Sequence, residues 1–419
     1  MNWNGKNVLI TGANGFVGSY LAKELLDNGS DVYGFIRPED MVAMEKNLTD
    51  KGIEDKLKMI EGDLNDITSL ASALDASQPD FIFHLAAQPS VEFSFRRPLE
   101  TQNINTIGTA NLLEAVRIKD VDAKIIFAGS SEEYGMVISS EAQYQRALND
   151  GKTITPEPES IPELPIKESN PLRPMSPYAV SKISGDFLMQ NYHNSYGLDT
   201  VVSRAFNHEG AGRGMMFVTS IITNQIMKLK HGETDRITIG NLNACRDWSH
   251  VQDIIQGYLI LADKGHSGEV YNQGSMRTNS VLSYILLGLE KAGWDIEQIE
   301  PVKDNLNNNA DNNANKTIQN PTEMNNDPIF GVKFDKTRVD QMILEDQLEY
   351  TLQDKGIKVQ TDQGNLTIEF NPERFRPAEI PLVLCDNRKI QKIGGKIEYS
   401  LSDIIQEQLN YFDQKENRI

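Results

Sequence analysis

The stretch "KNVLITGANGFVG", residues 6–18, predicts a β-strand, a tight turn and the start of a helix. Gly12, Gly15 and Gly18 follow one another at intervals of three residues. A phosphate needs the backbone close and its amides facing outward, which glycine allows and a Cβ would obstruct. The N-terminus of the following helix adds partial positive charge. In this strand–turn–helix context the spacing favours a dinucleotide site over a plain turn.

Strand and helix patterns alternate from this stretch to residue 130. Apolar runs typical of strands occupy 31–36, 56–63, 81–87 and 124–130, and helical patterns occupy 16–29 and 104–120. A further strand is expected in 195–207 and a further helix in 250–264. This alternation predicts an α/β fold, a doubly wound parallel sheet of Rossmann type with a smaller, mixed α/β C-terminal domain. We expect 1–205 to form the first domain, completed by 233–275, and 276–419 to form the second with 206–232.

Two segments interrupt the pattern. Residues 136–174 include the Pro-rich piece "DGKTITPEPESIPELP", and residues 304–327 are Asn-rich and of low complexity. The second is predicted to be a mobile surface loop, although either segment could instead bind a partner. After it, a charged helix is expected over about 336–354, then a hairpin over 355–370 with its turn near "TDQG".

Composition limits the class of protein. The formal net charge is −19 and the pI about 4.8, a field that repels nucleic acid. No apolar run is long enough to span a membrane, and the N-terminal residues do not resemble a secretory signal. The two cysteines, Cys245 and Cys385, are far apart and indicate a reducing compartment. We therefore expect a cytoplasmic protein with no metal site and no membrane or nucleic-acid partner.

The residues after the second strand bear on which dinucleotide binds. An acid here usually meets the ribose hydroxyls of NAD, but this strand ends at Arg37, with Glu39 and Asp40 following. An arginine can pair with a 2′-phosphate, so NADP is predicted and NAD remains possible. Asp63 ends the third strand, where it could meet the adenine amine or simply cap a turn.

"SPYAVSK", residues 176–182, places Tyr178 and Lys182 four residues apart, on one face of a helix. A phenol has a pKa of about 10, and a nearby ammonium favours the phenolate, as a cationic nicotinamide does. Tyr178 could then act as a base near neutrality, with Ser130 bonded to the same substrate oxygen. The three residues predict proton transfer coupled to hydride transfer.

Several stretches together resemble the extended short-chain dehydrogenase/reductase (NAD-dependent epimerase/dehydratase) family. They are "TGANGFVG", "HLAAQ", "NINTIGT", "GSSEEYG" and "YAVSK". "FNHEG", "GNLNACRDWSHVQD" and "RFRPAEIP" are similar to motifs of its GDP-mannose 4,6-dehydratase branch, whereas "LRPMSPY" and "KGHSGEVYN" also resemble the sister branch of GDP-4-keto-6-deoxy-mannose reductases.

The resemblance implies roles for individual residues. Glu132 would remove the C5 proton of a hexose, with Ser131 beside it, while Glu133 has no counterpart and is expected to be a solvated loop acid. The implied cofactor contacts are Gly12, Gly15, Phe16, Gly18, Arg37, Asp63, Leu64, Ala86, Tyr178 and Lys182.

The same resemblance places a nucleotide diphosphate against a group of polar residues. The group consists of Asn207, Arg213, Arg246, Arg376 and Glu379. Arginine forks suit diphosphate oxygens, and a carboxylate can accept from a guanine or a ribose. The motifs of that branch have paired arginines and a lysine in this region. Here Gly212 precedes Arg213, and Ile221 stands where the lysine would be, which puts GDP-mannose itself in doubt as the substrate. His208 is expected to be structural.

The sequence thus predicts a nucleotide-sugar 4,6-dehydratase acting through Ser130, Glu132, Tyr178 and Lys182. A 4-keto reductase or C4 epimerase is the alternative within the enzyme class, since neither needs Glu132. A non-catalytic dinucleotide sensor is the alternative outside it, but a sensor has no need of the proton relay. A homo-oligomer, dimer or tetramer, is also expected.

Overall fold

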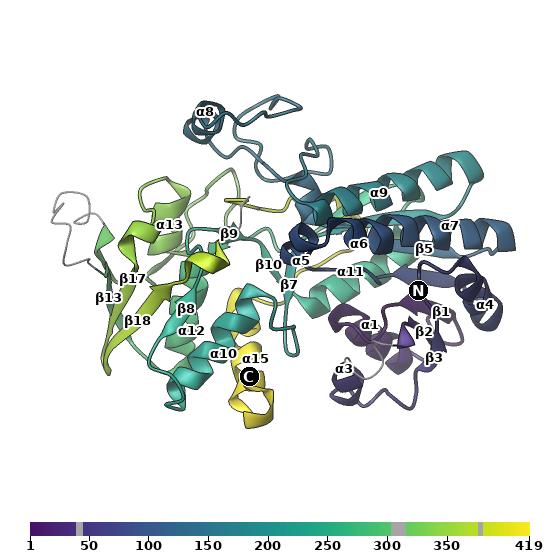
Figure 1. The fold of residues 1–419 in the computed structure, drawn as a ribbon, viewed down its shortest axis with the longest axis horizontal. Helices are drawn as coiled ribbons and strands as arrows, with labels where there is room; N and C mark the ends of the chain where they lie inside the picture. The colour runs from purple at the N-terminus through teal and green to yellow at the C-terminus, as the bar shows by residue number, and fades with distance from the viewer. Residues whose placement is uncertain (39–44, 303–315, 376–379) are drawn as a thin grey trace.

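The computed structural model describes residues 1–38, 45–302, 316–375 and 380–419, and its ribbon shows two sheets side by side (Figure 1). The larger sheet has seven strands in the order β11-β6-β5-β4-β1-β2-β3, and every neighbouring pair is parallel. Its strands are β1 Asn7–Thr11, β2 Asp31–Ile36, β3 Lys58–Glu61, β4 Phe81–His84, β5 Lys124–Ala128, β6 Thr200–Ala205 and β11 Val270–Gln273. The prediction of a parallel Rossmann sheet is confirmed.

Helices cover both faces of this sheet. The α1 helix (Phe16–Asp27) and α11 (Val251–Lys264) pack on one face, against Val8 and Ile10 of β1. The other face receives α4 (Ile67–Ser77), α7 (Gly108–Lys119) and α9 (Pro177–Tyr196), where Leu9 is buried. Successive side chains of a strand point to opposite faces, so a continuous apolar strand such as "VLI" supplies both layers.

The parallel direction brings all the strand ends that carry predicted site residues to one edge. β1 lies between β2 and β4. The chain therefore adds β2 and β3 on one side of β1 and adds β4, β5 and β6 on the other side. Ligands of such sheets bind outside the carboxyl ends of the strands at this reversal.

The second sheet has five strands in the order β14-β13-β17-β18-β8. It packs against α10 (Val218–Lys230), α12 (Val281–Ala292) and α15 (Leu401–Asp413) through a large apolar core. Its strands are β8 Ile237–Ile239, β13 Ile296–Pro301, β14 Ile318–Gln319, β17 Gly356–Thr361 and β18 Gly364–Phe370. β17 and β18 form the predicted hairpin.

The chain crosses between the two sheets more often than predicted. Residues 233–275 were expected to complete the first domain, but β8 pairs with β18 in the second sheet. Only the later part of that segment, α11 and β11, returns to the first. Beyond it, α14 (Arg388–Lys392) again belongs to the first core through Ile390. Sheet membership depends on strand partners distant in sequence, which the local pattern does not reveal.

Two predictions about the region after residue 303 are wrong. The charged helix expected over about 336–354 is α13 alone, Arg338–Leu344, because Leu348 and Tyr350 leave the helical path and are buried in the second core. The loop predicted for 304–327 lies in part outside the described residues, but its second half forms β14 and β15 (Met324–Asn325), with Ile318 buried.

The Pro-rich segment 136–174 is fastened to both halves of the molecule. Val137, Leu164 and Ile166 share a core with Phe206, which follows β6 of the first sheet, and with Phe334 and Leu384 of the second half. The segment carries α8 (Glu141–Asn149), which stands away from both sheets at the top of Figure 1.

A buried ion pair between Glu163 and Arg173 holds the C-terminal part of this segment in place. The Arg173 guanidinium donates to both carboxylate oxygens of Glu163 at 2.7 and 2.8 Å, and also to the carbonyls of Met136 and Pro156. Both side chains are only 5% exposed. These contacts therefore fix the position of the backbone shortly before Tyr178.

Candidate active site

The glycine turn has the geometry of a phosphate cradle. Gly12 has φ +74°, and a Cβ there would lie 3.0 Å from the backbone of Ala86. A Cβ at Gly18 would lie 2.1 Å from the Gly12 carbonyl oxygen. The α1 helix begins after Gly15, which has no side chain to cap it. The helix N-terminus is thus open to an anion at the edge where β1 and β4 end.

Buried polar side chains brace the neighbouring turn after β4. His84 is hydrogen-bonded through Nδ1 to Thr11 at 2.8 Å and through Nε2 to Thr109 at 2.9 Å. Burial, and secondarily Lys182, lowers the pKa of His84 to about 3, so the ring is neutral. Asn105 bonds both backbone groups of Gln88 and also Ser181 of α9. Sequence reasoning assigned no role to His84 or Asn105.

Three other predicted cofactor residues lie at the same sheet edge. Arg37 directly follows β2 and is exposed. Asp63 follows β3, and its carboxylate accepts from the Asn65 backbone amide at 2.8 Å, as a turn acid does. Leu64 is buried against Gly108.

Ser130 lies where β5 reaches the edge. Its hydroxyl accepts from the Glu132 amide at 3.2 Å, and its own amide donates to the Glu133 carboxylate at 2.7 Å. The two bonds form a capping box on the 3-10 turn Ser131–Tyr134. Ser131 is buried, and the box fixes the backbone around Ser130.

Tyr178 lies in the first turn of α9, facing this strand end. Burial raises the pKa of its phenol, and a hydrogen bond with Ser130 opposes that rise. The charge of Glu132 adds to the rise, as a charge on Glu133 would. Arg213 favours the phenolate through its charge. Tyr178 thus has Ser130, Glu132 and Arg213 as neighbours. Burial is the largest of these effects, and the lowered pKa of the phenol beside a cationic nicotinamide stays a prediction.

Lys182 lies one turn along α9 and is buried. Its Nζ donates to the Ala128 carbonyl at 2.7 Å and is 5.8 Å from the centre of the Tyr178 ring. Burial lowers the pKa of Lys182 to about 8, and a charge on Glu133 would oppose the change. The Lys182 ammonium therefore lies near the Tyr178 ring while its hydrogen bond goes to the Ala128 carbonyl.

Glu133 is not the solvated acid that was expected. It is 0% exposed, and its Oε2 lies 3.1 Å from Nε of Arg204, a buried residue of β6. The same Nε donates to Asp186 of α9 at 2.7 Å. Burial, then the charge of Asp186, raises the pKa of Glu133. The S-x-x-E pattern of Ser130 to Glu133 was the sequence signal for this inward position.

Arg213 joins the glycine turn to the candidate substrate loop. Its guanidinium lies 3.4 Å from the Phe217 ring centre and 5.0 Å from that of Phe16. Glu209 is 3.6 Å from its Nε. Asn207 begins β7 (Asn207–Glu209), beyond the end of β6, and is partly exposed. His208 bonds the Phe206 carbonyl, and burial lowers its pKa to about 3.

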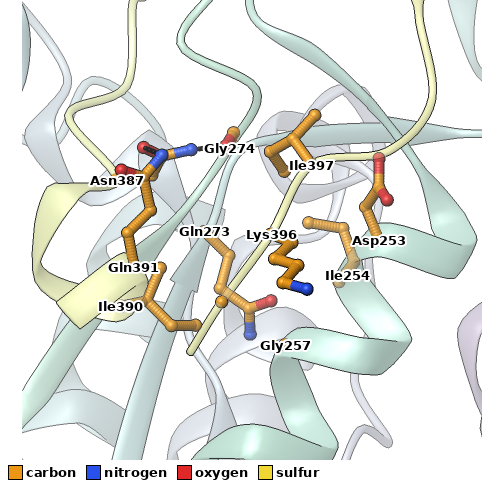
Figure 2. Close-up of a pocket in the computed structure, with 11 residues that line it drawn as sticks. Asp253, Ile254, Gly257, Gln273, Gly274, Asn387, Ile390, Gln391, Lys396 and Ile397 are labelled. Carbon is orange, nitrogen blue, oxygen red and sulfur yellow. Dashed lines mark hydrogen bonds between the residues drawn. The ribbon is translucent and has the colours of Figure 1, made fainter. Parts of the chain in front are cut away.

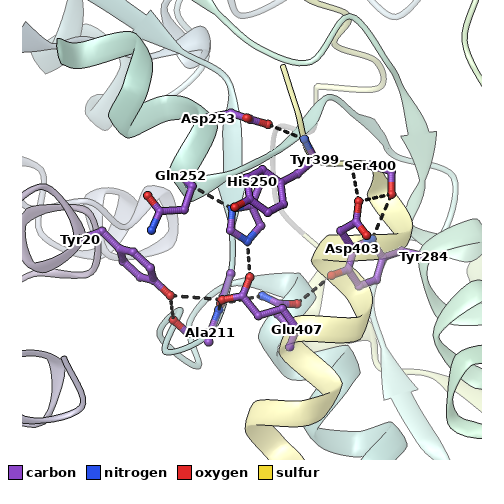
Figure 3. A network of polar contacts seen from close by, with 12 residues as sticks. Tyr20, Ala211, His250, Gln252, Asp253, Tyr284, Tyr399, Ser400, Asp403 and Glu407 are labelled. Carbon is purple, nitrogen blue, oxygen red and sulfur yellow. Dashed lines mark hydrogen bonds and ion pairs between the residues drawn. The ribbon is translucent and has the colours of Figure 1, made fainter. Parts of the chain in front are cut away.

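A polar latch holds the loop at Ala211, two residues before Arg213 (Figure 3). Tyr20 of α1 donates to the Ala211 carbonyl at 2.9 Å, and Glu407 of α15 accepts from the Ala211 amide at 3.2 Å. His250 bonds Glu407 through Nε2 while its Nδ1 accepts from the Gln252 amide. The latch therefore ties both halves of the molecule to one loop.

Three predicted substrate residues remain, and the structure describes one of them, Arg246. Arg246 lies in β9 (Cys245–Arg246), paired with β12 (Asn279–Ser280), at the junction of the two halves. Arg376 and Glu379 lie outside the described residues.

Two pockets lie elsewhere. One, of about 10 Å³, has room for a single water between α11 and residues 387–397, and Figure 2 shows Gln273, Asn387 and Lys396 around it. The other, of about 410 Å³, is an open groove between Ser275–Arg277 and Asn326–Asp335. Neither is lined by a predicted catalytic residue.

Within the described ranges, no helix is long and apolar enough to cross a membrane, and no cluster of His, Cys, Asp and Glu suits a metal ion.

Comparison with known sequences decides the family. The model of the NAD dependent epimerase/dehydratase family matches residues 8–274, which include the glycine turn, Ser130, Tyr178 and Lys182. The chain belongs to this family. The name of the family implies that its members bind a nicotinamide dinucleotide. The open cradle at Gly12 and Gly18 fits such a group.

Curated relatives in the epimerase/dehydratase family carry one recurrent name. GDP-mannose 4,6-dehydratase of Sinorhizobium fredii is 27% identical over 417 residues, 97% of each chain. GDP-mannose 4,6-dehydratase sdnI of Sordaria araneosa is 33% identical over 294 residues, 70% of this chain, and the match spans about half, 49%, of that relative's length.

Solved structures share the fold of the family. RMD from Pseudomonas aeruginosa, complexed with NADPH, has a TM-score of 0.64 at 23% identity and covers 97% of this chain and 99% of its own. UDP-glucose 4-epimerase of Thermus thermophilus, in complex with NAD, has a TM-score of 0.65 at 20% identity and covers 97% and 98%.

Proposed function

We propose that the protein is a nucleotide-sugar 4,6-dehydratase that uses NADP and converts a nucleoside-diphosphate hexose to its 4-keto-6-deoxy form. The observation that carries the proposal is the position of Glu132 in the 3-10 turn that Ser130 caps, where its amide donates to the Ser130 hydroxyl at 3.2 Å and its charge acts on the phenol of Tyr178. The name shared by the curated relatives supports the same reaction.

A bound nicotinamide dinucleotide would supply a hydride acceptor at C4 and later a hydride donor at C6 of the sugar. The residues that would hold it are the glycine turn, Ala86 and Lys182. Tyr178 would take the proton of the O4 hydroxyl, and Ser130 would hold that oxygen by a hydrogen bond. Lys182, buried beneath the ring, would stabilise the phenolate as it forms.

Glu132 would carry out the elimination. A ketone at C4 acidifies the proton at C5, which a carboxylate can then remove. The carboxyl group so formed would give its proton to the C6 hydroxyl, which leaves as water. A proton from solvent would then reach C5 when the hydride returns to C6.

A single assay tests the proposal. The purified protein is incubated with NADP and a set of nucleoside-diphosphate hexoses in deuterated water. A 4-keto-6-deoxy product with deuterium at C5 supports the dehydratase. Oxidation of NADPH by a 4-keto-6-deoxy sugar, with no product from any hexose, contradicts it and supports a reductase. Gly212 and Ile221 stand where the dehydratase pattern has cations, so the set of hexoses extends beyond GDP-mannose.

The choice of NADP rests on Arg37. Replacing it by Asp removes a charged partner for the 2′-phosphate and adds repulsion, so NADP should bind about 10–100-fold more weakly, while NAD changes by less than about threefold. Titration calorimetry with both cofactors measures this. Arg236→Asp, at the residue before β8 of the second sheet, is the charge-matched control. Equal losses for NADP and NAD in Arg37→Asp would contradict the assignment.

The latch at Ala211 should govern substrate binding. Tyr20→Phe removes the bond to the Ala211 carbonyl and frees the loop that carries Arg213, a loss of about 1.4 kcal/mol that raises KM for the nucleotide sugar about tenfold. Steady-state kinetics would show kcat nearly intact. Tyr192→Phe, which breaks a hydroxyl bond to Glu114 on α7, is the control and should leave KM unchanged. An unaltered KM in Tyr20→Phe would mean that the latch does not position the loop.

A further inference from the structure

Three ionisable side chains meet in the core directly behind Ser130. Glu133, Asp186 and Arg204 come from three separate elements, the 3-10 turn, α9 and β6, and their exposed fractions are 0%, 0% and 4%. Two carboxylates and one guanidinium would leave an uncompensated negative charge in the interior, which is costly.

The hydrogen bonds satisfy the two carboxylates unequally. Asp186 accepts at Oδ1 from Gln190 and at Oδ2 from Arg204 Nε, so both its oxygens have donors. Glu133 accepts at Oε1 from the Ser130 amide, but its Oε2 has no hydrogen-bond donor among the described residues. The single Nε–H of Arg204 lies near both carboxylates and is directed to Asp186.

The other charged and titratable groups around this cluster do not change that assignment. Arg204 donates through Nη1 to Tyr134, whose hydroxyl donates to Asn272, and Nη1 also reaches the Glu168 carbonyl. Lys182 is turned to the Ala128 carbonyl. Tyr178 and Glu132 lie on the Ser130 side, toward the reaction centre.

We propose that Glu133 is a positioning residue for Ser130, held as a neutral acid that donates its proton from Oε2 to Asp186 and accepts the Ser130 amide at Oε1. The carboxyl bond between Glu133 and Asp186 leaves one negative charge, which Arg204 balances. Gly129 leaves the space that this arrangement needs, because a Cβ there would lie 2.8 Å from Glu133 Oε1. The proposal rests on the role proposed for Ser130 in hydride transfer.

The neutral state distinguishes Glu133 from its neighbour Glu132. A neutral carboxyl and a carboxamide each offer a carbonyl acceptor on one arm and a donor, O–H or NH2, on the other, so glutamine can replace a protonated glutamate but not a carboxylate base. Methionine has a similar length and offers neither group. The two substitutions therefore separate packing from hydrogen bonding.

The kinetic experiment compares Glu133→Met with Glu133→Gln. Loss of the Ser130 amide bond displaces the hydroxyl, so Glu133→Met should lower kcat about 10–100-fold with KM within about threefold. Glu133→Gln should restore kcat to within about threefold of wild type. A loss in Glu133→Gln as large as in Glu133→Met would show that an ionised carboxylate is needed and would overturn the proposal.

An infrared measurement tests the proton without substrate. The carbonyl stretch of a protonated carboxylic acid should be present in the wild-type protein at pH 7 and absent from Glu133→Gln, with Glu163→Gln as the buried control that keeps the band. Its absence from wild type overturns the proposal even if the enzyme is a dehydratase. If the band is present in wild type and lost in Glu133→Gln, the proposal of a neutral acid is upheld. This result holds even if no nucleotide hexose is turned over, and in that case only the proposed function fails.

Discussion

Glu132→Gln is expected to lower the rate of 4-keto-6-deoxy sugar formation by about 10²–10⁴-fold, the contribution of a positioned acid–base group. Glutamine keeps the length and hydrogen bonding of the side chain but cannot take a proton from C5. Ser130, Tyr178 and Lys182 are untouched, so oxidation at C4 should persist in part. Stopped-flow absorbance should then show reduced cofactor accumulating in the variant but not in wild type.

Two observations would contradict this expectation. Deuterium at C5 of product formed by Glu132→Gln at the wild-type rate would remove Glu132 from the elimination. If cofactor reduction falls as much as product formation does, Glu132 acts in the oxidation at C4 instead of the elimination. Glu141→Gln, on the exposed face of α8, is the matched control and should have wild-type kinetics.

Arg173→Met is expected to lower the free energy of unfolding by about 3–5 kcal/mol, because it leaves the Glu163 carboxylate buried with its charge uncompensated. The carbonyls of Met136 and Pro156 also lose their donor. Urea denaturation followed by circular dichroism measures the change. The double variant Arg173→Met with Glu163→Met should recover much of the loss, since both charges are then absent.

The control is an ion pair of the same type at the surface. Arg146 and Asp346 are 3.3 Å apart with side chains 58% and 54% exposed, so Arg146→Met should cost less than about 1 kcal/mol. A cost for Arg173→Met no greater than for Arg146→Met would mean that water reaches Glu163 and that the segment is not held as described.

Local patterns predicted the first sheet well. The apolar strands, the glycine turn and the Tyr178–Lys182 spacing each depend on a few neighbouring residues, and parallel strands bring their carboxyl ends together. For this reason Ser130 and Tyr178 lie within hydrogen-bonding reach of each other.

What the sequence could not show depends on distant partners. Glu133 looks like a loop acid until Arg204 and Asp186 arrive from other elements. β8 looks like part of the first domain until β18 pairs with it. The Ala211 latch unites Tyr20 with Glu407, near opposite ends of the chain, and no local pattern contains both.

The late return of the chain to the first sheet bears on how the protein is made. β6 ends at Ala205, but its outer neighbour β11 begins only at Val270, after the chain has entered the second sheet. At a synthesis rate of about 5–20 residues per second, β6 would emerge roughly 3–13 s before the strand that covers it. During that interval a strand that is buried along its whole length in the finished fold has one unpaired edge, the kind of surface on which nascent chains associate. Chaperone demand should therefore peak on ribosomes that carry chains ending between these two strands.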